Sequence, residues 1–267
     1  MATFLPNGIG AISGDILVTG EPLLATGTIY YVSSSTGDVT YTGLNEERPF
    51  PALTNAQTVA SDGDIIVLLD GHFETFTGAL TLSKKLTIVG TGSSSGIPTC
   101  SFGMNADATL FTVGAGATGI EFRNIKFRTN LVSSTAQRID LSAASAVFSG
   151  CYFQMSGFDQ GPGILIANGL ANVRIENTTF ISTETAISPA PVAGLRAAGT
   201  TTDLVLKGVV FDGGARGFSA YAYDELGAAT RRRGTEISLL RGADANLHAS
   251  SVQSYWMPTT ATGGARS

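Results

Sequence analysis

The segment Ile120-Glu121-Phe122-Arg123-Asn124-Ile125-Lys126-Phe127 decides the fold, because its pattern recurs three more times along the chain. The later copies occupy residues 146–153, 173–180 and 204–211, and each copy ends in phenylalanine. Successive closing phenylalanines are 26, 27 and 31 residues apart. Repeats of this length are typical of solenoids, in which each copy forms one coil and packs on its neighbours.

Side chains alternate within each copy as a strand requires. The first and third positions are apolar and predicted to face a core, whereas the second and fourth face outward. The fifth position is always Asn or Gly, which tolerate left-handed backbone, so we expect a turn there. After it, the sixth position and the closing phenylalanine form a second inward pair. Stacked coils place four phenylalanines in one column, where burial of each contributes about 1.5–3 kcal/mol: Phe127, Phe153, Phe180 and Phe211.

We therefore predict an all-β protein, a right-handed parallel β-helix solenoid with a short N-terminal capping helix and an irregular N-terminal arm. The arm, which would serve as an attachment base, covers residues 1–27, and the β-helix covers residues 28–250. Residues 251–267 form a C-terminal cap and tail. Further strands are expected at 64–69, 86–89 and 110–113, and a second sheet at 163–167 and 194–197.

The first coils resemble a known family. The residues that carry the resemblance are Tyr30-Tyr31-Val32, Arg48-Pro49-Phe50-Pro51-Ala52-Leu53, Gly63-Asp64-Ile65-Ile66-Val67-Leu68 and Lys85-Leu86-Thr87-Ile88-Val89-Gly90. They resemble the pectin-lyase-like right-handed parallel β-helix superfamily, over roughly residues 28–250. The resemblance implies that a short helix seals the open end of the core, with Leu53, Ala56 and Ala60 on its buried face. It implies no single activity, since lyases, hydrolases, adhesins and viral fibres share the fold.

The composition argues against several classes of partner. Of the 267 residues, 14% are charged and 33 are glycine, which favours short strands and tight turns over long surface helices. A net charge of −5 gives no bulk attraction to nucleic acid or to an anionic membrane. The sequence lacks a signal-peptide pattern and any run of about 18 apolar residues. We therefore expect no nucleic-acid or membrane partner, and synthesis in a host cytoplasm without a signal peptide.

Carboxylates on the outward columns are the first candidates for catalysis. Glycoside hydrolysis needs two carboxyl groups about 5–9.5 Å apart, and a calcium site needs several converging oxygens. No two carboxylates are neighbours in either column, so we expect exposed ion pairs, for example Glu176 with Lys207, and no catalytic residue, cofactor or metal ligand. The second column reads Glu121, Val147, Arg174, Val205, and the fourth reads Arg123, Ser149, Glu176, Lys207. A pair assembled from loops stays an open alternative, drawn from Asp140, Asp159, Asp203, Asp212 and Asp224.

Other residues that could carry chemistry lack the spacing that such chemistry needs. The glycine-rich stretch 90–96 misses the pattern of a phosphate-binding loop and is interpreted as a turn. His72 and His248 lie in no triad or zinc context and are interpreted as structural. Cys100 and Cys151 are expected to be reduced, half-buried thiols.

Two sets of residues are candidates for contacts with other chains. The first set lies in the arm and near the tail and would contact a partner: Phe4, Leu5, Pro6, Arg231, Arg232, Arg233 and Trp256. Two alternatives stay open, because Trp256 could instead cap the last coil and the three arginines could form a solvated loop. The second set is more apolar than an outward face in water requires, and it predicts lateral self-association into a homotrimer: Val147, Tyr152, Val205 and Val210.

These features favour a non-enzymatic viral structural protein. The chain resembles bacteriophage structural proteins in its dissimilar arm and its stiff rod of low charge, and we expect a capsid decoration (cement) protein on the outer surface of the virion. Its partner would be the major capsid protein, several subunits of which it would contact at once. The alternative is a tail fibre or tailspike-like β-helix that binds or cleaves host-surface polysaccharide. If the protein is an enzyme, a polysaccharide lyase or glycoside hydrolase is expected.

Overall fold

The structure is a computed structural model. It describes residues 27–128, 136–155, 161–182, 193–213 and 237–238 with their side chains. Seven further strands are described by their backbone: β1 (Thr3–Leu5), β2 (Ile9–Ile12), β3 (Asp15–Val18), β4 (Glu21–Leu24), β25 (Tyr221–Glu225), β26 (Arg232–Leu240) and β27 (Ser254–Thr262).

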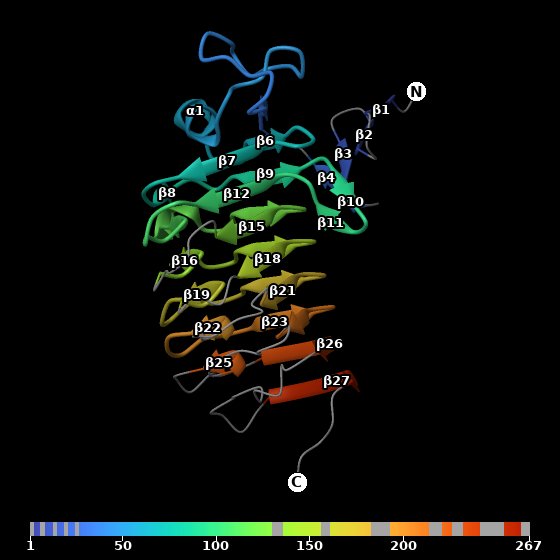
Figure 1. Ribbon diagram of the computed structural model, residues 1–267, viewed down its shortest axis with the longest axis vertical. Helices are drawn as coiled ribbons and strands as arrows, with labels where there is room; N and C mark the ends of the chain where they lie inside the picture. Colours follow the sequence, from blue (N-terminus) through green and yellow to red (C-terminus); the bar gives the residue numbers. More distant parts are fainter. Residues whose placement is uncertain are drawn as a thin grey trace.

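The chain winds into an elongated parallel β-helix whose strands stack rung upon rung (Figure 1). We call its three stacks of strands the first, second and third ladders. The first ladder consists of β5 (Ile29–Val32), β6 (Ile65–Leu68), β9 (Thr87–Gly90), β14 (Glu121–Arg123), β17 (Val147–Ser149), β20 (Arg174–Glu176), β23 (Leu204–Lys207) and β26.

The second ladder follows the first in each coil. It consists of β7 (Phe73–Phe76), β12 (Ser101–Met104), β15 (Lys126–Thr129), β18 (Tyr152–Met155), β21 (Thr179–Ser182) and β24 (Val210–Asp212). The long strand β26 pairs with β23, β24 and β27, so the two ladders and β27 together form one 15-stranded sheet.

The third ladder is a separate 6-stranded sheet, and it confirms the second sheet expected from the sequence. It consists of β8 (Leu80–Leu82), β13 (Phe111–Val113), β16 (Ile139–Leu141), β19 (Ile164–Ile166), β22 (Ala193–Ala197) and β25. This all-β parallel β-helix is compatible with a pectin-lyase-like fold.

The phenylalanine column predicted from the repeat is confirmed. Phe127, Phe153, Phe180 and Phe211 are paired in register on successive rungs, and all four are fully buried. Their ring centroids are 4.7, 4.8 and 5.2 Å apart, with interplanar angles of 19°, 14° and 13°. Rings therefore stack along the axis of the rod with almost the spacing of the backbone rungs, about 4.8 Å.

The turn predicted at the fifth position is also confirmed. Asn124, Gly150, Asn177 and Gly208 all have left-handed backbone, with φ between 47° and 63°. This corner separates the first ladder from the second. A further left-handed column, which we did not predict, lies directly before the first-ladder strands: Gly119, Ser145, Asn172 and Asp203, with φ of 82°, 55°, 58° and 54°.

The capping helix is α1 (Leu53–Val59), at the N-terminal end of the rod (Figure 1). Leu53 and Ala56 are fully buried and Ala60, just after the helix, is 2% exposed, as the sequence predicted. Glu74 Oε2 accepts a hydrogen bond from the Leu53 backbone N–H, 2.8 Å away. At the other end of the helix, Lys84 Nζ donates to the Ala60 carbonyl, 2.6 Å away. Charged side chains from the coils thus hold both ends of the cap.

Residues 3–24 differ from the irregular arm that the sequence led us to expect. Their backbone forms an antiparallel four-stranded sheet in the order β1-β2-β3-β4, separate from the ladders. Two residues separate β2 from β3 and β3 from β4, which is the commonest interval in β-hairpins.

Smaller elements complete the description. Strands β10 (Ser93–Ser94) and β11 (Ile97–Pro98) form a hairpin with left-handed Ser95 and Gly96 between them, which confirms the turn interpretation of this stretch. A short 3₁₀ helix, η1 (Ala115–Ala117), precedes β14. Within the described ranges, no helix has both the length and the apolar character to cross a membrane.

Candidate functional site

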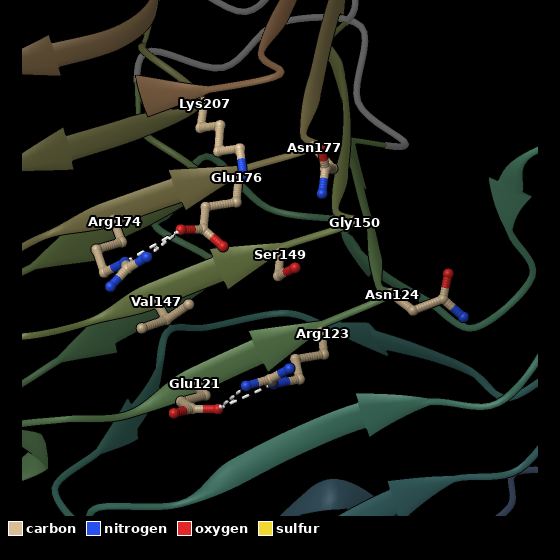
Figure 2. A pocket seen from close by; sticks show the side chains of 10 residues that line it. All are labelled: Glu121, Arg123, Asn124, Val147, Ser149, Gly150, Arg174, Glu176, Asn177 and Lys207. Atoms are coloured by element: carbon tan, nitrogen blue, oxygen red, sulfur yellow. Dashed lines mark hydrogen bonds and ion pairs between the residues drawn. The ribbon is translucent and has the colours of Figure 1, made fainter. Parts of the chain in front are cut away.

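A groove of about 650 Å³ runs along the outward face of the first ladder, beside the left-handed corner (Figure 2). Its floor comes from alternate residues of β14, β17, β20 and β23, because side chains two apart in a strand share one face. The lining consists of Glu121, Arg123, Asn124, Val147, Ser149, Gly150, Arg174, Glu176, Asn177 and Lys207. Polar side chains from four successive coils and from the corner therefore line this groove.

Two ion pairs lie in this groove, each within a single strand. Arg123 Nη2 is 2.8 Å from Glu121 Oε2 on β14, and Arg123 Nε donates to the same oxygen at 2.9 Å. On β20, Arg174 contacts Glu176 Oε1 in the same way, through Nη2 at 2.5 Å and Nε at 3.1 Å. The Arg174 side chain is 56% exposed, so such pairs contribute at most about 1 kcal/mol each to stability.

The expected pairing of Glu176 with Lys207 is wrong. The register places the two residues side by side on β20 and β23. Among the described residues, however, Glu176 is ion-paired with Arg174 and no ion pair joins it to Lys207. Arg174 reaches along its own strand, where its long side chain can present two donors to one carboxylate oxygen.

The two groove carboxylates are poorly placed to act as an acid and base pair. Glu121 and Glu176 lie two rungs apart, so their backbones are separated by about 10 Å along the stack. They also stand in different columns, which increases the separation. Each carboxylate is bound by an arginine, whereas a general acid must keep its proton. The groove is therefore best described as a charged binding surface.

The carboxylates that the sequence left open as a loop-built pair are separated either by ladder or by several rungs. Asp140 is on the third ladder and Asp212 is on the second, while Asp203 precedes the first ladder in the left-handed column. Asp224 shares the column of Asp140 but lies three rungs away, and Asp159 falls outside the described residues. Within the described part of the chain, no group of three or more His, Cys, Asp or Glu residues could hold a metal ion.

The first coil carries a polar pair, His72 and Glu74, and Glu74 takes the position that phenylalanine occupies in later coils. Glu74 is in register with Phe102 and so stands at the head of the phenylalanine column, beneath α1. His72, which is 1% exposed, accepts a hydrogen bond from the Ser34 N–H at Nδ1, over 3.0 Å. Its Nε2 lies 3.5 Å from Glu74 Oε2. His72 is thus part of the N-terminal cap, which agrees with the structural role expected from the sequence. His248 lies outside the described residues.

Both cysteines are more deeply buried than expected. Cys100 and Cys151 are free thiols that are 0% and 2% exposed. Burial raises the pKa of the Cys151 thiol to about 12, and burial also raises the pKa of Cys100. Neither is therefore suited to act as a nucleophile or a metal ligand, since the thiolate performs both functions.

The residues predicted to contact a partner lie largely beyond the side chains that the structure describes. Pro6 and Arg231 are outside the described residues. The other five are placed only by their backbone: Phe4 and Leu5 in β1, Arg232 and Arg233 in β26, and Trp256 in β27.

The four residues predicted to form a self-association face divide between two ladders. Val147 and Val205 share an outward column of the first ladder, which runs along the groove. Tyr152 and Val210 share an outward column of the second ladder, beyond the left-handed corner. All four are half-buried. Sequence reasoning identified the outward columns correctly, but it did not identify the groove that the corner creates beside them.

Comparison with protein-family models finds no match for this chain, and comparison with curated proteins finds no significant relative.

Proposed function

We propose that this protein is a non-enzymatic structural protein of a virion, and specifically a bacteriophage capsid decoration (cement) protein. The observation that carries the proposal is the arrangement of the groove carboxylates. Glu121 and Glu176 are each neutralised by an arginine of the same strand and stand two rungs apart. This arrangement suits a surface that makes contacts better than one that breaks glycosidic bonds.

The two-part construction of the chain supports attachment to a shell. Residues 3–24 form their own antiparallel sheet, while the ladders form a stiff rod. An attachment base that contacts several coat subunits would hold by many modest contacts, which sum through high effective concentration. Self-association of the rods would multiply these contacts, and the major capsid protein is the proposed partner.

Binding to particles tests the proposal. Full-length protein is added to virus particles from the source of the sequence that lack this chain, and bound protein is measured after sedimentation. Saturation at a fixed ratio to coat subunits is expected. A variant without residues 1–27 should keep a folded β-helix, shown by a cooperative thermal melt, and lose binding. No binding by the full-length protein would overturn the proposal, and binding by the truncated protein would overturn the role of the base.

A second candidate is a fibre that binds or cleaves host-surface polysaccharide, and the groove itself favours it. Arginine, lysine, asparagine, serine and glutamate side chains line a groove of about 650 Å³ along four coils, a surface able to hydrogen-bond an extended sugar chain. The test is incubation with capsular polysaccharide, measuring retention on a polysaccharide column and release of reducing ends. Retention or release that Glu121→Gln or Glu176→Gln weakens would favour this candidate over decoration.

A further inference from the structure

The two ion pairs of the groove have opposite polarity. On β14 the glutamate stands in the second column and the arginine in the fourth, whereas on β20 the order is reversed. Strand β17 lies between them and presents only Val147 and Ser149 to the groove (Figure 2). The four charges therefore occupy the four corners of a rectangle, and their signs alternate around it. The uncharged strand β17 runs between the two charged strands.

This charge pattern is complementary to itself. We propose that the groove face binds a second copy of this chain, about a two-fold axis that runs along β17. Rotation about that axis exchanges the rungs of β14 and β20 and keeps the columns. Glu121 then faces Arg174 of the second copy, and Arg123 faces Glu176 of the second copy. Val147 faces its own symmetry mate, as an isologous interface requires.

The donors and acceptors of the groove allow these additional contacts. Both guanidinium groups use Nε and Nη2 for the carboxylate of their own strand. A guanidinium has five N–H donors, so others are available for a second carboxylate. Each glutamate receives these bonds on one oxygen, Oε2 of Glu121 and Oε1 of Glu176, which leaves the other oxygen as an acceptor. Four charged contacts between copies can thus form without breaking those within each copy.

Burial at one end of the groove decides the relative direction of the rods. Val67 and Val89 precede Arg123 in the outward fourth column, yet they are only 1% and 0% exposed. Other parts of the chain therefore cover this end of the face, whereas Lys207 at the other end is exposed. Parallel rods would bring one covered end against the other. Antiparallel rods place each covered end over the open end of the second copy, so we infer an antiparallel pair.

Exchange of charges within a rung tests this geometry with an internal control. The variant Glu121→Arg/Arg123→Glu keeps the composition, the net charge and an ion pair within β14. In the antiparallel pair it places arginine opposite arginine and glutamate opposite glutamate. The variant that also carries Arg174→Glu/Glu176→Arg restores opposite charges at all four contacts. Parallel rods would keep opposite charges in both variants, because each residue would then face the other column of its own rung.

The measurement is the dissociation constant from sedimentation equilibrium of the full-length chain at low ionic strength. We expect the wild type to form a species of twice 27.5 kDa. The single exchange should weaken the pair by at least about tenfold, and the double exchange should restore it. Circular dichroism and thermal melting confirm that both variants fold. A monomeric or trimeric wild type, an unaffected single exchange, or a double exchange that does not recover would each overturn the proposal, whatever the function of the protein.

Discussion

Phe153 occupies the middle of the phenylalanine column, and its truncation is the most informative test of the core. Its ring is fully buried and stacks on Phe127 at 4.7 Å and on Phe180 at 4.8 Å. Phe→Ala substitutions in cores cost about 3–5 kcal/mol. Each stacked pair adds about 0.5–1.5 kcal/mol beyond the buried area. Because both neighbours lose a stacking partner and the rungs of a continuous ladder cannot close the gap, we expect Phe153→Ala to lie in the upper part of the Phe→Ala range, at about 4–5 kcal/mol.

Urea denaturation followed by circular dichroism measures this loss as a fall in the free energy of unfolding. Val39→Ala is the control, because Val39 is 72% exposed and its truncation should cost less than about 0.5 kcal/mol. Phe153→Leu should fall between the two, because it keeps most of the apolar volume but loses both stacks. A cost below about 1.5 kcal/mol for Phe153→Ala would refute the stacked column as a main source of stability.

Three further predictions concern the cap, the corner and the thiols. Lys84→Met removes the donor to the carbonyls of Gln57 and Ala60 and should destabilise the protein by about 1–3 kcal/mol in urea melts, whereas exposed Lys85→Met should have little effect. Gly208→Ala places a methyl group 2.5 Å from Asn177 Oδ1. Gly150 has nearly the same φ, but the methyl group of Gly150→Ala would have no neighbouring atom closer than 3.8 Å. Both variants should lose about 1–2 kcal/mol of unfolding free energy, because alanine is strained in left-handed backbone. Only Gly208→Ala should lose more than this, and Asn177→Gly should restore part of the additional loss. Because burial raises the pKa of Cys151 from 9.0 to about 12, its contribution to stability should be complete below pH 9 and should decline between pH 9 and 12. In the native protein the thiol should resist labelling at pH 8 until denaturant is added, and rapid native labelling would contradict its burial.

The sequence predicted the features that follow from alternation and from the backbone preferences of single residues. The inward columns and the corner at Asn124 and Gly150 are of this kind, because strand period and left-handed tolerance are properties of the residues themselves. The left-handed column at Ser145 and Asn172 could have been found in the same way, since Gly, Ser, Asn and Asp recur there at the same intervals as the phenylalanines.

Other features depend on three-dimensional choices that the repeat does not encode. An arginine such as Arg174 can reach a glutamate along its strand or across a rung, and its side-chain conformation decides between them. The groove depends on the angle of the corner. The first coil does not match the repeat pattern, because Glu74 stands where later coils have the column phenylalanine and instead binds the N-terminal end of α1. Where the coil must end, the requirements of the cap override the repeat.

The parallel stacking of coils in register is the central claim, and a distance between spin labels tests it most directly. Thr87 and Val205 share one outward column, four rungs apart, although 118 residues separate them in the sequence. Labels are attached to cysteines at these two positions, with buried Cys100 and Cys151 left unmodified, and labelled protein is diluted with unlabelled protein. Stacking predicts a narrow distribution centred on a backbone separation of about 19 Å. A broad distribution, or one centred beyond about 30 Å, would contradict the β-helix.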